Sequence, residues 1–171
     1  MTLSARNWGA TEAEREASYP CDSHAVDGAD GYFRAVGVDA PPDVVFRWLC
    51  QLKTAPYSYD LIDNFGRRSP RELTPDLDEL ERGQPFLVFS LVDFAVNDHL
   101  TLVGLPTATR LFGPLAITYA VRGVGTGTRL VVKMLVGRSG PLGGVRRYLL
   151  GWGDVVMMRK QLLTIKELAE R

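Results

Sequence analysis

The stretch APYSYDLIDNFGR, residues 55–67, gathers hydroxyl, carboxylate and amide side chains in a short segment. Its candidates for catalysis are Tyr57, Tyr59 and Asp60, because a tyrosine beside a carboxylate can polarise a carbonyl group and move a proton. Catalysis would require that one tyrosine faces a cavity and that burial shifts the pKa of the carboxylate. The same residues could instead form a polar corner that joins a helix to a sheet, and this is the interpretation that we favour.

The rest of the sequence offers little conventional chemistry. The glycine-rich segment RGVGTGTR, residues 122–129, precedes a strand-like sequence rather than a helix, so it predicts a hairpin and not a phosphate-binding loop. Neither His24 nor His99 has a histidine or cysteine at metal-ligand spacing, and we expect His99 at the surface or at a strand edge. The cysteines, Cys21 and Cys50, form no CxxC pair. We therefore expect no metal and no cofactor.

A second group of side chains could contact an apolar ligand. Tyr119 lies in the middle of a strand-like segment and shares a face with Ile117 and Val121, which places one hydroxyl in an apolar row. The C-terminal segment carries a wide apolar stripe at helical spacing, with Val156 and Leu163 alongside it. For Tyr119 and Trp152, core packing is the first interpretation and ligand contact the second. The candidate ligand contacts are Trp48, Tyr59, Tyr119, Tyr148, Trp152, Val155 and Met158.

The elements that must position these residues follow from periodicity. Residues 1–31 are polar and rich in small side chains, so we expect a loosely docked N-terminal arm before a single domain at 32–171. A strand at 32–38 is followed by two prolines that suit the start of a helix, and by a second short helix. The chain then alternates as an antiparallel meander and ends in a long helix. Its predicted strands are 86–96, 99–105, 115–123 and 129–137, and its final helix is 145–171.

This order predicts an α+β fold in which a curved antiparallel sheet wraps around the C-terminal helix. A sheet that grips one helix tends to leave an apolar space between them, and ligand sites prefer such concave places.

Composition limits the possible partners. The formal net charge is zero, with 20 basic and 20 acidic side chains, so overall charge does not attract the chain to nucleic acid or to an anionic membrane. No apolar run approaches the roughly 18 residues that a membrane span needs. The N-terminal sequence lacks the apolar core of a signal peptide, so we expect a cytoplasmic protein with reduced cysteines, although a disulfide between Cys21 and Cys50 remains open.

Four stretches resemble the START-like, or Bet v 1-like, helix-grip superfamily (SRPBCC), which includes polyketide cyclase/dehydratase-like proteins. They are VDAPPDVVFRWLCQL, YSYDLIDNFG, TYAVRGVGTGTRLVV and GDVVMMRKQLLTIKELAE. The second and fourth are similar to an uncharacterised bacterial subgroup. The resemblance implies a seven-stranded antiparallel sheet around a cavity for an apolar small molecule. It brings no shared catalytic motif, so it sets an expectation for function without establishing one.

Three functions follow as expectations. The first is binding of a small hydrophobic molecule, lipid-like or polyketide-like, between the sheet and the C-terminal helix. The second is a cyclase or dehydratase that uses Tyr57, Tyr59 and Asp60. The third is a non-catalytic interaction domain in which the N-terminal arm docks onto itself or onto a partner. The sequence leaves a monomer and a homodimer equally open.

Overall fold

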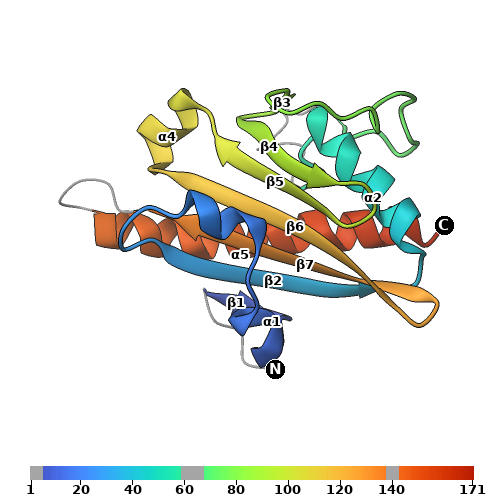
Figure 1. Cartoon of the computed structure of the whole chain (residues 1–171), viewed down its shortest axis with the longest axis horizontal. Helices are drawn as coiled ribbons and strands as arrows, with labels where there is room; N and C mark the ends of the chain where they lie inside the picture. The colour runs from blue at the N-terminus through green and yellow to red at the C-terminus, as the bar shows by residue number, and fades with distance from the viewer. Residues whose placement is uncertain (1–5, 59–67, 138–142) are drawn as a thin grey trace.

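The computed structural model describes residues 6–58, 68–137 and 143–171, apart from the side chains of residue 111 and of residues 143–155. Its centre is one seven-stranded sheet in the order β1-β2-β7-β6-β5-β4-β3 (Figure 1). All neighbouring strands are antiparallel except β1, which runs parallel to β2. The strands are β1 (Asn7–Trp8), β2 (Asp30–Val38), β3 (Pro85–Phe86), β4 (Phe89–Ala95), β5 (His99–Gly104), β6 (Leu115–Val124) and β7 (Gly127–Val136).

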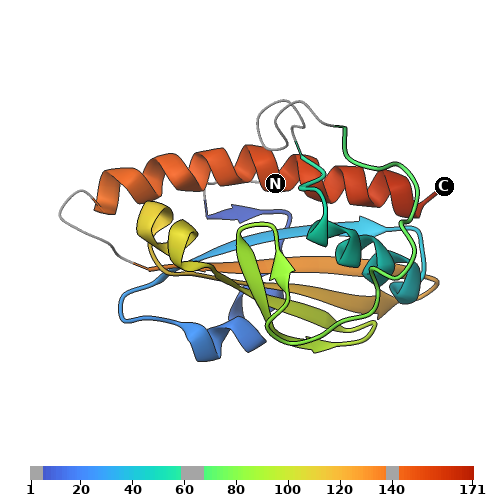
Figure 2. The ribbon, with the colours of Figure 1, turned by 90° about the horizontal axis from the view of Figure 1, so that it is seen from above.

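One face of the curved sheet holds the long C-terminal helix α5 (Gly143–Ala169), and the other face holds the N-terminal segment (Figure 2). We call these the concave and the convex face. The predicted α+β helix-grip fold is therefore confirmed. No helix of the described residues is both long and apolar enough to cross a membrane.

The helix after β2 forms as predicted. Proline stands at the first position of α2 (Pro42–Cys50), where its missing N–H leaves no hydrogen bond unmade. Val45, Trp48 and Leu49 form its buried face, and the turn η2 (Gln51–Lys53) extends it.

The second predicted short helix falls largely within 59–67, outside the described residues. The short helix α4 (Pro106–Phe112) was not predicted, because its sequence reads as a turn between two prolines.

The N-terminal segment packs more closely than its composition indicates. It contains α1 (Glu12–Glu16) and η1 (Pro20–His24), and Cys21 of η1 has no exposed surface. The backbone N–H of Cys21 donates to Thr118 Oγ1 of β6 at 2.9 Å. A small second core lies on this convex face, separate from the main core on the concave face. Its members are Tyr19, Cys21, Phe33, Ala35, Ala116, Ala120, Val131 and Leu135.

The apolar stripe of α5 differs from the predicted one. Leu162 and Ile165 are fully buried, as expected. Val156 and Leu163, expected alongside them, are 51% and 36% exposed. The buried positions beside the stripe hold Gln161 and Thr164 instead. The helix therefore brings polar side chains into its interface with the sheet.

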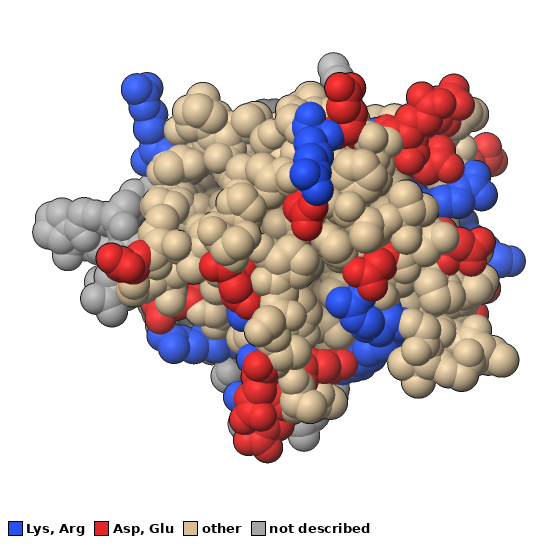
Figure 3. All heavy atoms as spheres, in the orientation of Figure 1, with Lys and Arg blue, Asp and Glu red and all other residues tan. Residues whose placement is uncertain are grey.

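Charged side chains cover the outside unevenly. On the face shown in Figure 3, acidic side chains gather over the long connection between η2 and β3. That connection contains several exposed acidic residues, among them Glu72, Asp76, Asp78, Glu79 and Glu81.

Candidate functional site

The concave face carries a chain of buried hydrogen bonds that crosses from the sheet to α5. Strand β6 directs Tyr119 towards the helix, and its hydroxyl donates to Gln161 Oε1 at 2.9 Å. The Nε2 of Gln161 in turn donates to the carbonyl oxygen of Pro56 at 2.7 Å. The sulfur of Met158 lies 3.8 Å from the same tyrosine hydroxyl. Sheet, helix and the start of the polar stretch 55–67 are thus joined at one buried point.

Arg34 brings a charge to the same face. It shares the concave side of β2 with Tyr32 and is 1% exposed, and its guanidinium lies 6.0 Å from the Tyr32 ring centroid. Its Nη1 donates to the carbonyl oxygen of Phe33 at 2.8 Å. Taking a charged group out of water costs several kcal/mol unless other groups compensate it. Arg34 therefore places a fully buried cation within the otherwise apolar concave face.

The strand register places Arg34 and Tyr119 in one row. Val132 of β7 is the Cα partner of both residues. Because neighbouring strands lie about 4.8 Å apart, the two Cα atoms are roughly 10 Å from each other. The row therefore presents a cation and a hydroxyl on either side of a valine, beneath the helix that carries Gln161.

Arg34 and Gln161 were missed by the sequence reasoning. Arg34 could have been found, because it interrupts an otherwise apolar alternation of Tyr32, Val36 and Val38 on one strand face. Gln161 gives no comparable signal, since it could lie on either border of the helical stripe.

Tyr57 occupies an unusual backbone conformation. Its φ is +52°, a region that bulky residues rarely adopt, and its side chain is 1% exposed. The ring packs edge-on against Trp48, with centroids 6.0 Å apart and planes at 80°. Tyr57 is thus buried in the main core on the concave face. The other catalytic candidates, Tyr59 and Asp60, lie outside the described residues, so the catalytic triplet stays a prediction.

Three of the predicted ligand contacts, Trp48, Tyr119 and Met158, lie in the main core. Tyr59 is outside the described residues, and so are the side chains of Tyr148, Trp152 and Val155, although the backbone of these three belongs to α5. Their roles in binding remain predictions.

The C-terminal half of α5 packs tightly against the concave face of the sheet. Leu162 and Ile165 have no exposed surface there, and Leu168 is 3% exposed. The Oγ1 atom of Thr164 is buried and has no hydrogen-bond partner among the residues that the structure describes. This end of the interface between α5 and the sheet is therefore filled by side chains.

The thiol of Cys50 gives the site no nucleophile. Burial raises its pKa to about 12, so it stays protonated at neutral pH. Cys21 lies on the convex face, and both cysteines are free thiols. Among the residues with a described position, no three histidine, cysteine, aspartate or glutamate side chains are grouped closely enough to hold a metal ion.

His99 is the first residue of β5, and 13% of its side chain is accessible. Its Nδ1 lies 2.7 Å from Asp98 Oδ2, and its Nε2 lies 3.1 Å from Asp93 Oδ2. Ser90 directs its hydroxyl to the Gly83 carbonyl oxygen at 3.3 Å. This cluster therefore holds strand ends together.

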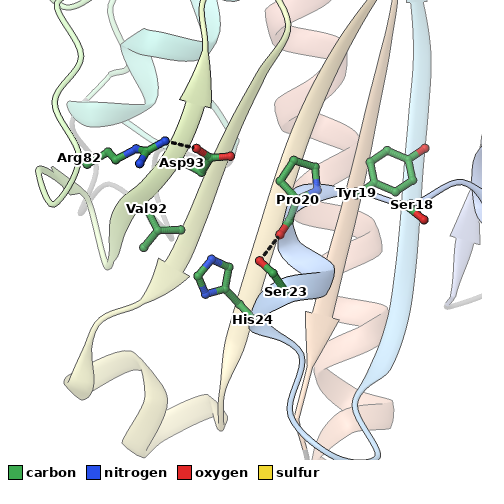
Figure 4. Close-up of a pocket in the computed structure, with 8 residues that line it drawn as sticks. All are labelled: Ser18, Tyr19, Pro20, Ser23, His24, Arg82, Val92 and Asp93. Atoms are coloured by element: carbon green, nitrogen blue, oxygen red, sulfur yellow. Dashed lines mark hydrogen bonds and ion pairs between the residues drawn. The ribbon is translucent and has the colours of Figure 1, made fainter.

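A groove of about 550 Å³ lies on the convex side, between η1 and β4 (Figure 4). Its polar groups already bind one another: Arg82 Nη2 donates to Asp93 Oδ1 at 2.7 Å, and Ser23 Oγ donates to the Pro20 carbonyl oxygen at 2.8 Å. The groove is open to solvent and faces away from α5. The concave face is therefore the stronger candidate.

Comparison with known proteins supports the fold at low sequence identity. No protein-family model matches the chain, and neither does any curated protein. The structure of protein NE0264 from Nitrosomonas europaea is 13% identical over 84% of this chain and 96% of that one, with a TM-score of 0.55. The Polyketide_cyc-like protein Cgl2372 from Corynebacterium glutamicum is also 13% identical, over 84% and 93% of the two chains, with a TM-score of 0.50.

A third structure is the di-domain ARO/CYC StfQ from the steffimycin biosynthetic pathway. It is 14% identical over 83% of this chain and 51% of that one, with a TM-score of 0.51. The chain thus spans about half of StfQ. At these identities the likeness establishes architecture alone. The chain has the helix-grip fold of START-like, Bet v 1-like proteins.

Proposed function

We propose that this protein binds a small hydrophobic molecule, lipid-like or polyketide-like, between the concave face of the sheet and α5. The observation that carries the proposal is the buried row of Arg34 and Tyr119 beneath Gln161, set in an otherwise apolar face. Ligand pockets combine apolar walls with a few placed polar groups. The apolar walls would supply affinity, at about 25 cal/mol per Å² of buried surface. The polar row would fix orientation.

The direct test is to recover the ligand. Protein purified under native conditions is denatured, extracted with organic solvent and analysed by mass spectrometry. We expect an apolar compound in molar proportion to the protein. Only trace amounts, together with no binding of apolar compounds by the refolded protein, would contradict the proposal.

Tyr119→Phe tests the row itself. It removes the hydroxyl that donates to Gln161 but keeps the ring, so the recovered ligand should bind more weakly. Tyr19→Phe is a matched control, because the Tyr19 hydroxyl is also an internal donor, to the Glu14 carbonyl oxygen at 2.8 Å, but on the convex face. Equal affinity in wild type and both variants would remove Tyr119 from the site.

A second candidate function is a cyclase or dehydratase reaction. Tyr57 favours it, because strained backbone in a bulky, buried residue often marks a functional position. The likeness to a structure described as ARO/CYC is consistent with it. The test is to incubate a linear polyketide with the protein and to follow loss of water by mass. Turnover that survives Tyr57→Phe would exclude this tyrosine as the proton-transfer group.

A further inference from the structure

The hairpin between β3 and β4 exposes two aliphatic side chains at a strained turn. Phe86 and Phe89 pair across it, so its two-residue loop is Leu87–Val88. Leu87 has a φ of +55°, at the first loop position, where a two-residue hairpin turn favours glycine. Leu87 and Val88 are 44% and 48% exposed.

The folded chain gains little in return for this conformation. The left-handed region costs about 1–2 kcal/mol for a residue with a side chain. Asp76 and Asn97 also have positive φ, but they belong to the types that tolerate it best. Tyr57 is strained too, yet its ring is fully buried. Leu87 alone among the four combines strain with an exposed apolar side chain, which points to a contact outside the chain.

The turn contacts the residue that precedes α4, the helix that carries Arg110. The N–H of Leu105, the residue before α4, donates to the Val88 carbonyl oxygen at 2.9 Å. Arg110 of α4 is exposed and forms no ion pair with any residue that the structure describes. Figures 1 and 2 both place α4 at the end of the molecule where α5 begins.

The stretch of chain that contains α4 and the first turns of α5 is basic in sequence. Between His99 and Gly153 the chain has no aspartate or glutamate but seven arginines and lysines. Three of these seven are paired with acidic residues elsewhere: Arg122 with Asp98, Arg129 with Glu14 and Lys133 with Asp22. Arg110 is not, and two further arginines stand in the first turns of α5, at positions 146 and 147. The net charge of zero thus conceals a stretch of chain without acidic side chains.

We propose that this end of the molecule docks on the surface of an anionic lipid bilayer. Leu87 and Val88 enter the boundary between headgroups and acyl chains, and Arg110 lies at the level of the phosphates. Apolar side chains combined with nearby cations are what reversible binding to an anionic interface requires. Two side chains at a tip suit insertion between lipids better than a protein interface, which needs a broad complementary area.

The test is sedimentation of the full chain with vesicles of phosphatidylcholine, with or without phosphatidylglycerol. We expect binding to the anionic vesicles, weakened by salt. Leu87→Asp combined with Val88→Asp should lower the partition coefficient about tenfold. The matched control is Val96→Asp with Val124→Asp, because these valines are 65% and 63% exposed at hairpins of the opposite end. Equal losses in both pairs would overturn the proposal.

The variant Leu87→Gly distinguishes the backbone strain at this position from the contact that the Leu87 side chain makes with the bilayer. Glycine accepts a positive φ, so this variant should unfold at a higher urea concentration than wild type while it binds vesicles less well. Unchanged vesicle binding would remove Leu87 from the docking surface.

Arg110→Glu should weaken binding to anionic vesicles about fivefold or more, whereas Arg15→Glu, an exposed position on α1, should not.

Binding of equal strength to neutral and anionic vesicles would also overturn the proposal. None of these readouts requires a ligand under α5. Failure of vesicle docking is therefore distinguishable from failure of the proposed ligand binding.

Discussion

Arg129 of β7 binds Glu14 of α1 through two parallel hydrogen bonds, from Nε to Oε1 at 2.7 Å and from Nη2 to Oε2 at 2.9 Å. The same Nη2 donates to the carbonyl oxygen of Gly9 at 2.6 Å. The pair is partly shielded from water, with side-chain exposures of 25% for Arg129 and 20% for Glu14. Two-point pairs of this kind fix geometry as well as adding energy. The N-terminal segment is therefore attached to the sheet in one defined position.

Glu14→Gln should destabilise the protein by about 1 kcal/mol at pH 7. The hydrogen bonds from Arg129 hold the pKa of Glu14 below its ordinary value of 4.5. A carboxyl with a lowered folded pKa contributes stability above its unfolded pKa and loses it as the pH falls. Urea unfolding should therefore separate wild type from variant at pH 7, and the difference should shrink below about pH 4.5. Glu12→Gln, an exposed position on the same helix, is the control. A difference that did not shrink as the pH falls below 4.5 would contradict this account.

The bond between Tyr119 and Gln161 should be measurable as a coupling energy. Gln161→Leu deprives both the Tyr119 hydroxyl and the Pro56 carbonyl oxygen of a partner, so it should cost about 2 kcal/mol or more. Tyr119→Phe leaves Gln161 Oε1 without its donor. The double variant should lose about 1 kcal/mol less than the sum of the two single losses. Strict additivity in urea unfolding would show that the two side chains do not support each other.

Adjacent leucines on α5 should respond very differently to truncation. Leu162 has no exposed surface, so Leu162→Ala should cost about 2–5 kcal/mol through lost burial and a residual cavity. Leu163 is 36% exposed, and Leu163→Ala should cost about 0.5 kcal/mol or less. Thermal unfolding of the two variants under one buffer condition compares them directly. Similar losses would mean that the helix is rotated relative to this description.

Both thiols should be unreactive in the folded protein. Burial raises the pKa of Cys21 above its ordinary value and that of Cys50 to about 12, so neither is a thiolate at pH 8. A chromogenic disulfide reagent should therefore label no cysteine in native buffer and both cysteines in denaturant. Labelling of Cys50 at the rate of a free thiol under native conditions would contradict its burial.

Local patterns predicted the scaffold, whereas the site depends on distant contacts. The alternation of side-chain types in 115–123 and 129–137 was sufficient to place β6 and β7, because successive residues of a strand point to opposite faces of the sheet. Tyr119 was identified as a candidate for the same reason. Its partner Gln161 was not, because 42 positions separate the two residues. The docking of Cys21 onto Thr118 spans 97 positions and was equally invisible.

Strand β6 serves two cores with alternate residues. Ile117, Tyr119 and Val121 face α5, whereas Ala116 and Ala120 support the N-terminal segment on the other side. Mutations can therefore accumulate in the two sets independently, because the two sets pack in separate cores on opposite faces of the sheet. Substitutions at the odd-numbered residues of β6 would therefore reshape the surface that faces α5. The even-numbered residues Ala116 and Ala120 would still hold the N-terminal segment against the convex face of the sheet.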